Sequence, residues 1–405
     1  MPSAEQRILL KLLGAALFDA PLPKAEGVDW DAVLEESLAQ SVQPLAFAGA
    51  QPILPPEKLP AWKKAAALRL AQNIACRAEY AEAADCLRAS GASFTMLKGT
   101  ASARYYPLPE LRTMGDVDFF VPEAQRPAAE AEILKRGFVR RYELGDPKIE
   151  WIYRRPPKSS WEMHAQINGM PQNAAGETAR RLLSELCGRS EIIKTAEGSY
   201  PVPQAFHHGL ILLLHTAHHL TDSGVGLRHF CDWAVFAAAV SERFEAMFRD
   251  ALTELGLWRF AQVLTRCAER ALGMPGQSYT REVEDDLADR LTEDLLNTGD
   301  LGKKDRARMD QRNYLWDRSS SKVSTLPAPI QLLHNITAAA KRDCPKAAEH
   351  PILLPWAWLK TAARCGMELI SGKRTLGDRR LRKAAQAHRR LYGQLALFEG
   401  KKDEG

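Results

Sequence analysis

The chain has 405 residues, of which 45% are hydrophobic and 26% charged, and its 55 basic and 50 acidic side chains give a formal net charge of +5. This composition is typical of a globular protein with room for two or three domains, and so small a charge excess selects no class of partner. No apolar run approaches the roughly 18 residues that a membrane-spanning helix needs, so we expect no membrane span.

The first 90 residues carry a helical pattern, rich in Ala and Leu, with charges at helical intervals. The apolar N-terminus is interrupted at this spacing by charged residues, namely Glu5, Arg7 and Lys11. This arrangement predicts an amphipathic helix rather than a secretory signal. Asp29 precedes a periodic run and would cap the helix that begins there. Residues 55–90 read as one long helix, and we place an N-terminal helical region over residues 1–90.

The pattern changes at Ser93, where short strands begin to alternate with helices. Strands are predicted over residues 93–98 and 117–121, with Gly99 and a short helix between them, and a helix follows over residues 122–138. Three further strand candidates then occur in succession, over residues 138–144, 149–155 and 160–167. This order predicts an α+β fold, with a small mixed β-sheet core over residues 91–200 flanked by N-terminal and C-terminal helical regions.

Helical periodicity returns after Pro203. Four helices are predicted, over residues 204–220, 228–240, 243–256 and 259–273. We assign residues 201–275 to a helical bundle region. Residues 276–405 form a C-terminal helical region with a polar linker and a basic tail. The stretch 274–325 is polar and interrupted by Pro and Gly, and residues 299–313 within it are expected to be a mobile connection.

Two of the predicted strands carry acidic residues on one face. Because strand side chains alternate, Asp116 and Asp118 point one way and the apolar residues between and after them point the other. The strand over 160–167 alternates likewise and places Glu162 and His164 on one face. Neighbouring strands could therefore bring Asp116, Asp118 and Glu162 together. Because clustered carboxylates repel, such a site calls for a divalent cation, and oxygen ligands suit Mg²⁺ or Mn²⁺.

A glycine turn forms the second half of the expected site. Gly99 and Thr100 join a strand to a short helix, where backbone N–H groups can approach phosphates, and Lys98 and Arg112 add positive charge. Two metal ions about 3.5–4 Å apart can hold the attacking and leaving oxygens of a nucleotidyl transfer. We therefore expect the aspartates to bind metal and the metal to bind a nucleoside triphosphate (NTP). The alternative is an ordinary solvated strand face that carries two aspartates.

These residues resemble the uncharacterised-nucleotidyltransferase branch of the polymerase-β-like superfamily. The pattern is found here as "LKG" at 97–99, "YP" at 106–107, "RTMGDVD" at 112–118 and "EMH" at 162–164. Three later segments are also similar to parts of the family, namely 212–220, 226–236 and 350–359. The resemblance therefore spans most of the chain, and its most specific part is residues 95–167.

The resemblance implies roles for individual residues and an activity. Gly99 and Thr100 match the superfamily's turn that binds triphosphate, and Asp116 and Asp118 match its metal-binding pair. Glu162 matches a third acidic position, which helps to bind metal and assists deprotonation of the acceptor hydroxyl. Threonine stands where serine is commoner, and 15 residues separate Thr100 from Asp116, which implies an extra turn. The implied reaction transfers NMP from an NTP to an acceptor hydroxyl and releases pyrophosphate.

Histidines in the bundle region have several interpretations. His215 and His219 lie one helical turn apart, which is the spacing of a zinc pair. Thr216 stands where zinc proteases carry a glutamate, and no third ligand is evident from the sequence. We therefore favour buried histidines that are satisfied by hydrogen bonds, with a position beside the nucleotide cleft as the second interpretation.

Three further polar residues are secondary candidates. Arg228 and Asp232 are four residues apart on a predicted helix and are expected to form an ion pair, with contact to triphosphate as the alternative. His164 shares a strand face with Glu162, and we expect it to support the site rather than to act directly.

The C-terminal tail and the cysteines bear on partners and compartment. Residues 373–390 contain eight Lys and Arg against one Asp, a stripe that could contact nucleic acid or an anionic membrane surface. Few aromatic residues interrupt it, so a solvated basic helix is the default interpretation. The seven cysteines are scattered without a Cys-x-x-Cys pair, which predicts reduced thiols and a cytoplasmic protein.

Three hypotheses of function follow. The first is an Mg²⁺-dependent nucleotidyltransferase whose acceptor is a small molecule, a sugar, a protein or RNA. The second is a non-catalytic nucleotide-binding interaction protein that uses its helical regions. The third is an RNA-directed enzyme that adds nucleotides.

Overall fold

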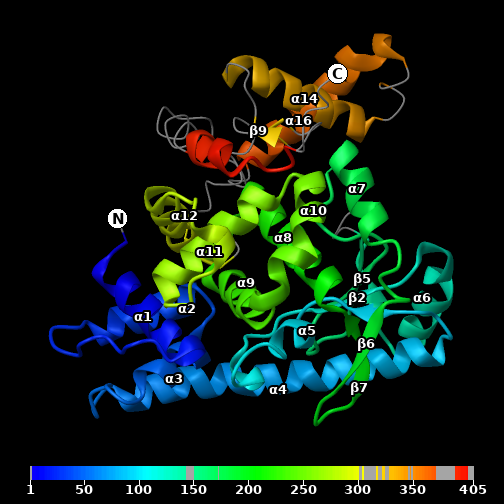
Figure 1. Ribbon diagram of the computed structural model, residues 1–405. Helices are drawn as coiled ribbons and strands as arrows, with labels where there is room; N and C mark the ends of the chain where they lie inside the picture. The colour runs from blue at the N-terminus through cyan, green and yellow to red at the C-terminus, as the bar shows by residue number, and fades with distance from the viewer. Residues whose placement is uncertain are drawn as a thin grey trace.

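A computed structural model gives the architecture of the chain (Figure 1). It describes residues 2–142, 150–171, 173–300, 328–344, 350–370 and 388–399, together with residues 303, 304, 316, 317, 322, 323 and 347. Within these residues helices surround one small mixed sheet, which confirms the predicted α+β fold.

Four helices form the N-terminal part: α1 (Ala4–Phe18), α2 (Trp30–Ala39), α3 (Gln43–Ala50) and α4 (Leu59–Ala89). The sequence predicted α1, α2 and α4, whereas α3 was not singled out. The side chain of Asp29 accepts a hydrogen bond from the Ala32 N–H and so caps α2, as the sequence indicated. Helix α4 has 31 residues and is therefore about 46 Å long at 1.5 Å per residue. It passes along one side of the molecule from α3 to α6, underneath the sheet in Figure 1.

The sheet has five strands in the order β1-β2-β5-β4-β3. Their bounds are Thr95–Met96 (β1), Val117–Phe120 (β2), Val139–Arg140 (β3), Glu150–Arg154 (β4) and Trp161–His164 (β5). Strands β2 and β5 are parallel neighbours, whereas the other pairs are antiparallel. The apolar side chains of β2 and β5 are fully buried on one face, against α4 and α6 (Arg126–Lys135). The opposite face of β2 and β5 carries the acidic residues Asp118 and Glu162.

A short helix and a hairpin adjoin the sheet. Helix α5 (Thr100–Ala103) follows β1 directly. The hairpin of β6 (Ser190–Lys194) and β7 (Ser199–Pro203) packs beside β1, and α7 (Ala174–Leu182) precedes it. Short 3₁₀ turns occur at Pro109–Leu111, Glu123–Gln125, Ser241–Arg243, Ser278–Thr280 and Pro351–Leu353.

The helices after the sheet largely follow the prediction. They are α8 (Ala205–Thr221), α9 (Leu227–Ala239), α10 (Phe244–Leu255), α11 (Trp258–Leu272), α14 (Ala328–Asp343) and α16 (Leu354–Ile370). Residues 388–395 are also helical, and Tyr392 and Leu395 from this segment join the main core. A two-residue pair of strands is formed by β8 (Trp316–Asp317) and β9 (Lys322–Val323).

One helix in this part of the chain was not predicted. The polar stretch 274–325 was given no helix of its own, but residues Asp285–Thr298, ahead of the expected mobile connection at 299–313, form helix α12. Leu287, Leu291 and Leu295 recur at four-residue spacing and are buried against α11, and this apolar stripe outweighs the polar composition around it. Most of residues 301–327 lie outside the described residues, as does the basic stretch 373–387.

Two further observations concern the cysteines and the apolar character of the helices. The six cysteines whose state is described are all free thiols: Cys76, Cys86, Cys187, Cys231, Cys267 and Cys344. Among the described residues no helix combines the length and the apolar character that crossing a membrane requires.

Candidate functional site

The parallel pairing of β2 and β5 brings two predicted acids together. Asp118 is directly opposite Glu162 in the register of the two strands, and Phe120 is opposite His164. Asp118 is 6% exposed, whereas Asp116 precedes the strand and stays accessible to solvent. All three acids line one cavity of about 270 Å³. The predicted convergence of Asp116, Asp118 and Glu162 is therefore present in the structure.

Asp118 is the electrostatic centre of this group. Its Oδ1 atom lies 2.8 Å from Nζ of Lys98 and 3.2 Å from Nε2 of His164. Although burial opposes ionisation, the charge of Lys98 and the hydrogen bond from His164 hold the pKa of Asp118 well below its usual range. Asp118 is therefore an anion at neutral pH, and the contact with His164 restrains the orientation of its carboxylate.

The other two acids are compensated less, because burial and neighbouring carboxylates outweigh the charge of Lys98. Burial, followed by the charges of Asp118 and Asp116, raises the pKa of Glu162. Although Asp116 stays accessible to solvent, partial desolvation in the cavity lining and the charge of Asp118 also raise its pKa. Asp116 and Glu162 are therefore difficult to ionise beside the charged Asp118. A bound cation would stabilise the ionised form of all three carboxylates.

The donor set therefore fits a divalent metal ion. Ligand atoms of Asp118, Glu162 and His164 all lie within 4.8 Å of one another, and Asp116 lines the same cavity. Carboxylate oxygens are the donors that Mg²⁺ and Mn²⁺ prefer. Asp116, Asp118 and Glu162 are accordingly the residues that could hold such an ion.

The raised pKa of Glu162 predicts a pH dependence of stability in the metal-free protein. Above the ordinary pKa of about 4.5 the unfolded chain releases the Glu162 proton while the folded chain keeps it, so the free energy of unfolding falls as pH rises towards the folded-state pKa. The slope from this one group is at most about 1.4 kcal/mol per pH unit. Glu162→Gln should remove it, so the variant should gain stability relative to the wild type between about pH 5 and 8.

Urea unfolding in the presence of a chelator, at several pH values, measures this effect. Glu57→Gln changes an exposed glutamate and is the matched control, which should leave the pH dependence of the wild type unchanged. Parallel stability curves for wild type and Glu162→Gln would contradict the raised pKa.

The turn before α5 has a backbone that only glycine adopts readily. Gly99 has φ +62° and ψ −107°, and a Cβ built on it would lie 2.1 Å from the hydroxyl oxygen of Tyr80. Gly99 lines the cavity, whereas Thr100 is 4% exposed and is not among its lining residues. The structure therefore places Gly99 and Lys98 beside the acids and leaves the Thr100 side chain in the interior.

We expect Gly99→Ala to destabilise the protein by about 2–4 kcal/mol, because it combines an unfavourable backbone conformation with a clash against buried Tyr80. Gly91→Ala is the matched control, since Gly91 has φ +71° but its added Cβ would meet nothing within 4 Å. Gly91→Ala should lower the free energy of unfolding by only about 1–2 kcal/mol, which is the cost of the left-handed backbone conformation for alanine. Chemical denaturation measures both, and equal losses would show that the contact with Tyr80 is unimportant.

The predicted basic residues have partners other than those expected from the sequence. Arg112 is buried, and its guanidinium binds both carboxylate oxygens of Asp232, at 3.1 and 2.7 Å. The hydroxyl of Tyr106 also donates to Asp232, at 2.7 Å. Arg228 lies 3.4 Å from a carboxylate oxygen of Asp300, so the expected pair between Arg228 and Asp232 is replaced by two long-range pairs. Arg112 and Asp232 thus join the loop before β2 to helix α9.

Helix α4 holds the long loop that carries Arg112 and Asp116. The Asn73 side chain donates to the Glu110 carbonyl at 3.0 Å and accepts from the Met114 N–H at 2.9 Å. The hydroxyl of Tyr80 donates to the carbonyl of Asp116 at 3.1 Å. These contacts fix the extra turn that the spacing between Thr100 and Asp116 implied.

Two polar residues of the cavity were missed by the sequence analysis. Glu150, the first residue of β4, is opposite His164, and its Oε2 lies 3.5 Å from Nδ1 of that ring. Asn168 donates to Glu150 at 2.7 Å. The alternation of residues 149–155 would have placed Glu150 on the acidic face had that strand been read in the same way as the other two.

The wall opposite the acids is formed by α8 and α9. The predicted residues His215 and His219 of α8 line the cavity, as do Arg228 and His229 of α9. His229 was not singled out from the sequence, because it lies on a different helix from the pair that carries the recognisable spacing. The cavity therefore has an acidic sheet wall and a wall rich in histidine.

Comparison with known proteins agrees with this arrangement. Residues 26–273 match a family described as uncharacterised nucleotidyltransferases, a match that extends from the start of α2 to the end of α11 and includes both walls of the cavity. Because it covers more than half of the chain, the chain belongs to this family of nucleotidyltransferases, as the sequence motifs indicated. No curated protein is detectably similar to the chain.

Proposed function

We propose that the protein is an Mg²⁺-dependent nucleotidyltransferase that transfers NMP from an NTP to an acceptor hydroxyl and releases pyrophosphate. One observation carries the proposal: Asp118 and Glu162 face each other in register beside the Gly99 turn, in a chain of a nucleotidyltransferase family. The free thiols favour a cytoplasmic location.

Asp116, Asp118 and Glu162 would hold the metal. When bound, a divalent ion supplies charge neutralisation for the triphosphate and a template for the attacking and leaving oxygens. His164 keeps Asp118 oriented through the 3.2 Å contact. Lys98, now paired with Asp118, would exchange that partner for a phosphate oxygen when the cation takes over the carboxylate.

The proton of the acceptor hydroxyl goes to Glu162 in this proposal. The acceptor oxygen forms a bond to the α-phosphorus, the bond from that phosphorus to the bridging oxygen breaks, and pyrophosphate leaves. A bound cation would keep Glu162 ionised, so its carboxylate could accept that proton. The turn at Gly99 would bring backbone N–H groups to the β- and γ-phosphates.

The test is to incubate the purified chain with each labelled NTP, Mg²⁺ and cell extract, and to identify what becomes labelled. Label transfer and pyrophosphate release are expected with Mg²⁺ and should both disappear when a chelator removes it. Calorimetry on the same samples separates the alternatives. NTP binding without pyrophosphate release over any acceptor panel, RNA included, would instead support a non-catalytic nucleotide-binding protein.

A further inference from the structure

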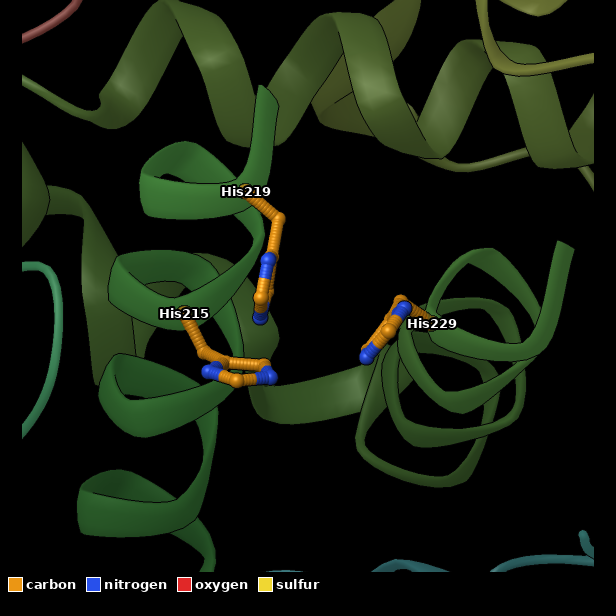
Figure 2. Close-up of side chains that lie close together, drawn as sticks. All are labelled: His215, His219 and His229. Carbon is orange, nitrogen blue, oxygen red and sulfur yellow. The ribbon is translucent and has the colours of Figure 1, made fainter. Parts of the chain in front are cut away.

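Three histidines meet in the wall of the cavity opposite the acids. His215 and His219 stand one turn apart on α8, and His229 reaches them from α9, as Figure 2 shows. The ring centroids are 4.3 Å apart for His215 and His219, and 5.2 Å for each of these with His229. A ligand nitrogen from each ring lies within 4.8 Å of the other two. The third ligand that the sequence did not reveal is therefore His229.

Hydrogen bonds satisfy only part of this cluster. Nδ1 of His229, a ring that the sequence analysis did not single out, is buried without a hydrogen-bond partner among the described residues. Nδ1 of His219 lies 3.2 Å from Oγ of Ser223, which leaves its Nε2 to the cluster. A hydrogen bond on one ring nitrogen is the usual means of orienting the other nitrogen towards a metal.

The chemistry of the three rings suits a transition-metal cation as the missing partner. Imidazole nitrogens are common ligands of Zn²⁺ and related ions, and one nitrogen of each ring lies within 4.8 Å of a nitrogen of the other two. The nearby cations Lys98 and Arg228 are each paired with a carboxylate, Asp118 and Asp300, which reduces their repulsion of a bound metal ion.

We propose that His215, His219 and His229 bind one transition-metal ion of the Zn²⁺ class, in a site separate from the carboxylates. Nitrogen ligands suit Zn²⁺, whereas Mg²⁺ prefers the oxygen atoms of the opposite wall. Tetrahedral coordination with bonds of about 2.05 Å sets the nitrogens about 3.4 Å apart, so small side-chain rotations complete the site. Three protein ligands leave a fourth position open, and all three rings line the cavity.

This proposal goes beyond the proposed transferase activity and does not depend on it. Metal binding is measured on the full chain without nucleotide. The protein is stripped with a chelator, supplied with excess Mg²⁺, and titrated with Zn²⁺ by calorimetry. We expect one Zn²⁺ per chain and a higher melting temperature of the metal-loaded protein.

Variants locate the ion. His215→Ala and His229→Ala should each weaken Zn²⁺ binding at least about a hundredfold, because altering even an outer neighbour of a metal ligand costs 10–100-fold. His350→Ala is the control, since His350 is an exposed histidine that is outside the cluster and does not line the cavity, and this variant should bind Zn²⁺ as the wild type does. Asp118→Asn should also leave Zn²⁺ affinity unchanged. His229→Gln is measured if His229→Ala does not fold.

Co²⁺ gives a readout that needs no variant. Co²⁺ held by three nitrogens in a tetrahedral site absorbs visible light strongly, whereas octahedral oxygen coordination absorbs weakly. The strong spectrum is expected, and Zn²⁺ should displace it. A weak octahedral spectrum, no Zn²⁺ binding by the folded wild type, or loss of binding in Asp118→Asn but not in His229→Ala would each overturn the proposal.

Discussion

Asp118→Asn is expected to reduce Mg²⁺-dependent NTP turnover at least about a hundredfold. Replacing a residue that only contacts a metal ligand already costs up to about a hundredfold, and Asp118 is proposed as a ligand itself. Asparagine keeps the shape of the side chain but removes the negative charge that the cation requires. Asp118 is the central acid, with Lys98 and His164 both on its Oδ1 atom. Pyrophosphate release with and without Mg²⁺ measures the effect.

The control for this substitution is Asp85→Asn. Asp85 lies on α4, is 68% exposed at its side chain, and pairs with Arg88 across one helical turn. The same loss of charge there should leave turnover unchanged. Circular dichroism and unfolding curves confirm that Asp118→Asn is folded, and a folded variant with wild-type turnover would refute the role of Asp118 in metal binding.

Arg112→Met is expected to destabilise the fold by about 3–5 kcal/mol, because it leaves the charge of Asp232 buried without its partner. The side chains of this pair are 6% and 3% exposed. Adding Asp232→Asn should restore part of the loss, since asparagine removes the unpaired charge and still accepts the Tyr106 hydrogen bond. Denaturant unfolding of the single and double variants measures the difference.

Arg180→Met is the control for the buried pair. Arg180 pairs with Glu177 on the surface, with side chains 41% and 77% exposed, and should lose no more than about 1 kcal/mol. A similarly small loss for Arg112→Met would mean that the contact between the β2 loop and α9 contributes little, and would leave Arg112 available for triphosphate.

The acidic residues of the site could be predicted because the sequence pattern that reveals them lies within single strands. Alternation along β2 and β5 fixes which side chains share a face, and one glycine marks the turn beside them. The parallel register that sets Asp118 opposite Glu162 then follows from burying the apolar face of both strands.

The remainder depends on contacts between distant elements. Arg112 pairs with Asp232 across 120 residues, and no pattern within α9 distinguishes this partner from Arg228 on the same helix. His229 joins His215 and His219 only because α8 and α9 pack side by side. Helix α12 was missed because a polar composition was weighed above the spacing of its leucines.

The attachment of the β2 loop to α4 bears on how substrates enter. Asn73 and Tyr80 lie on the same face of the long helix α4, and their hydrogen bonds hold the backbone of the loop up to Asp116. This side of the cavity is therefore expected to be rigid. If the cavity opens to bind a nucleotide and to release pyrophosphate, we expect the movement in the wall formed by α8 and α9. A metal ion bound by His215, His219 and His229 would link α8 to α9 and restrict their relative motion. It would thereby slow nucleotide binding and pyrophosphate release.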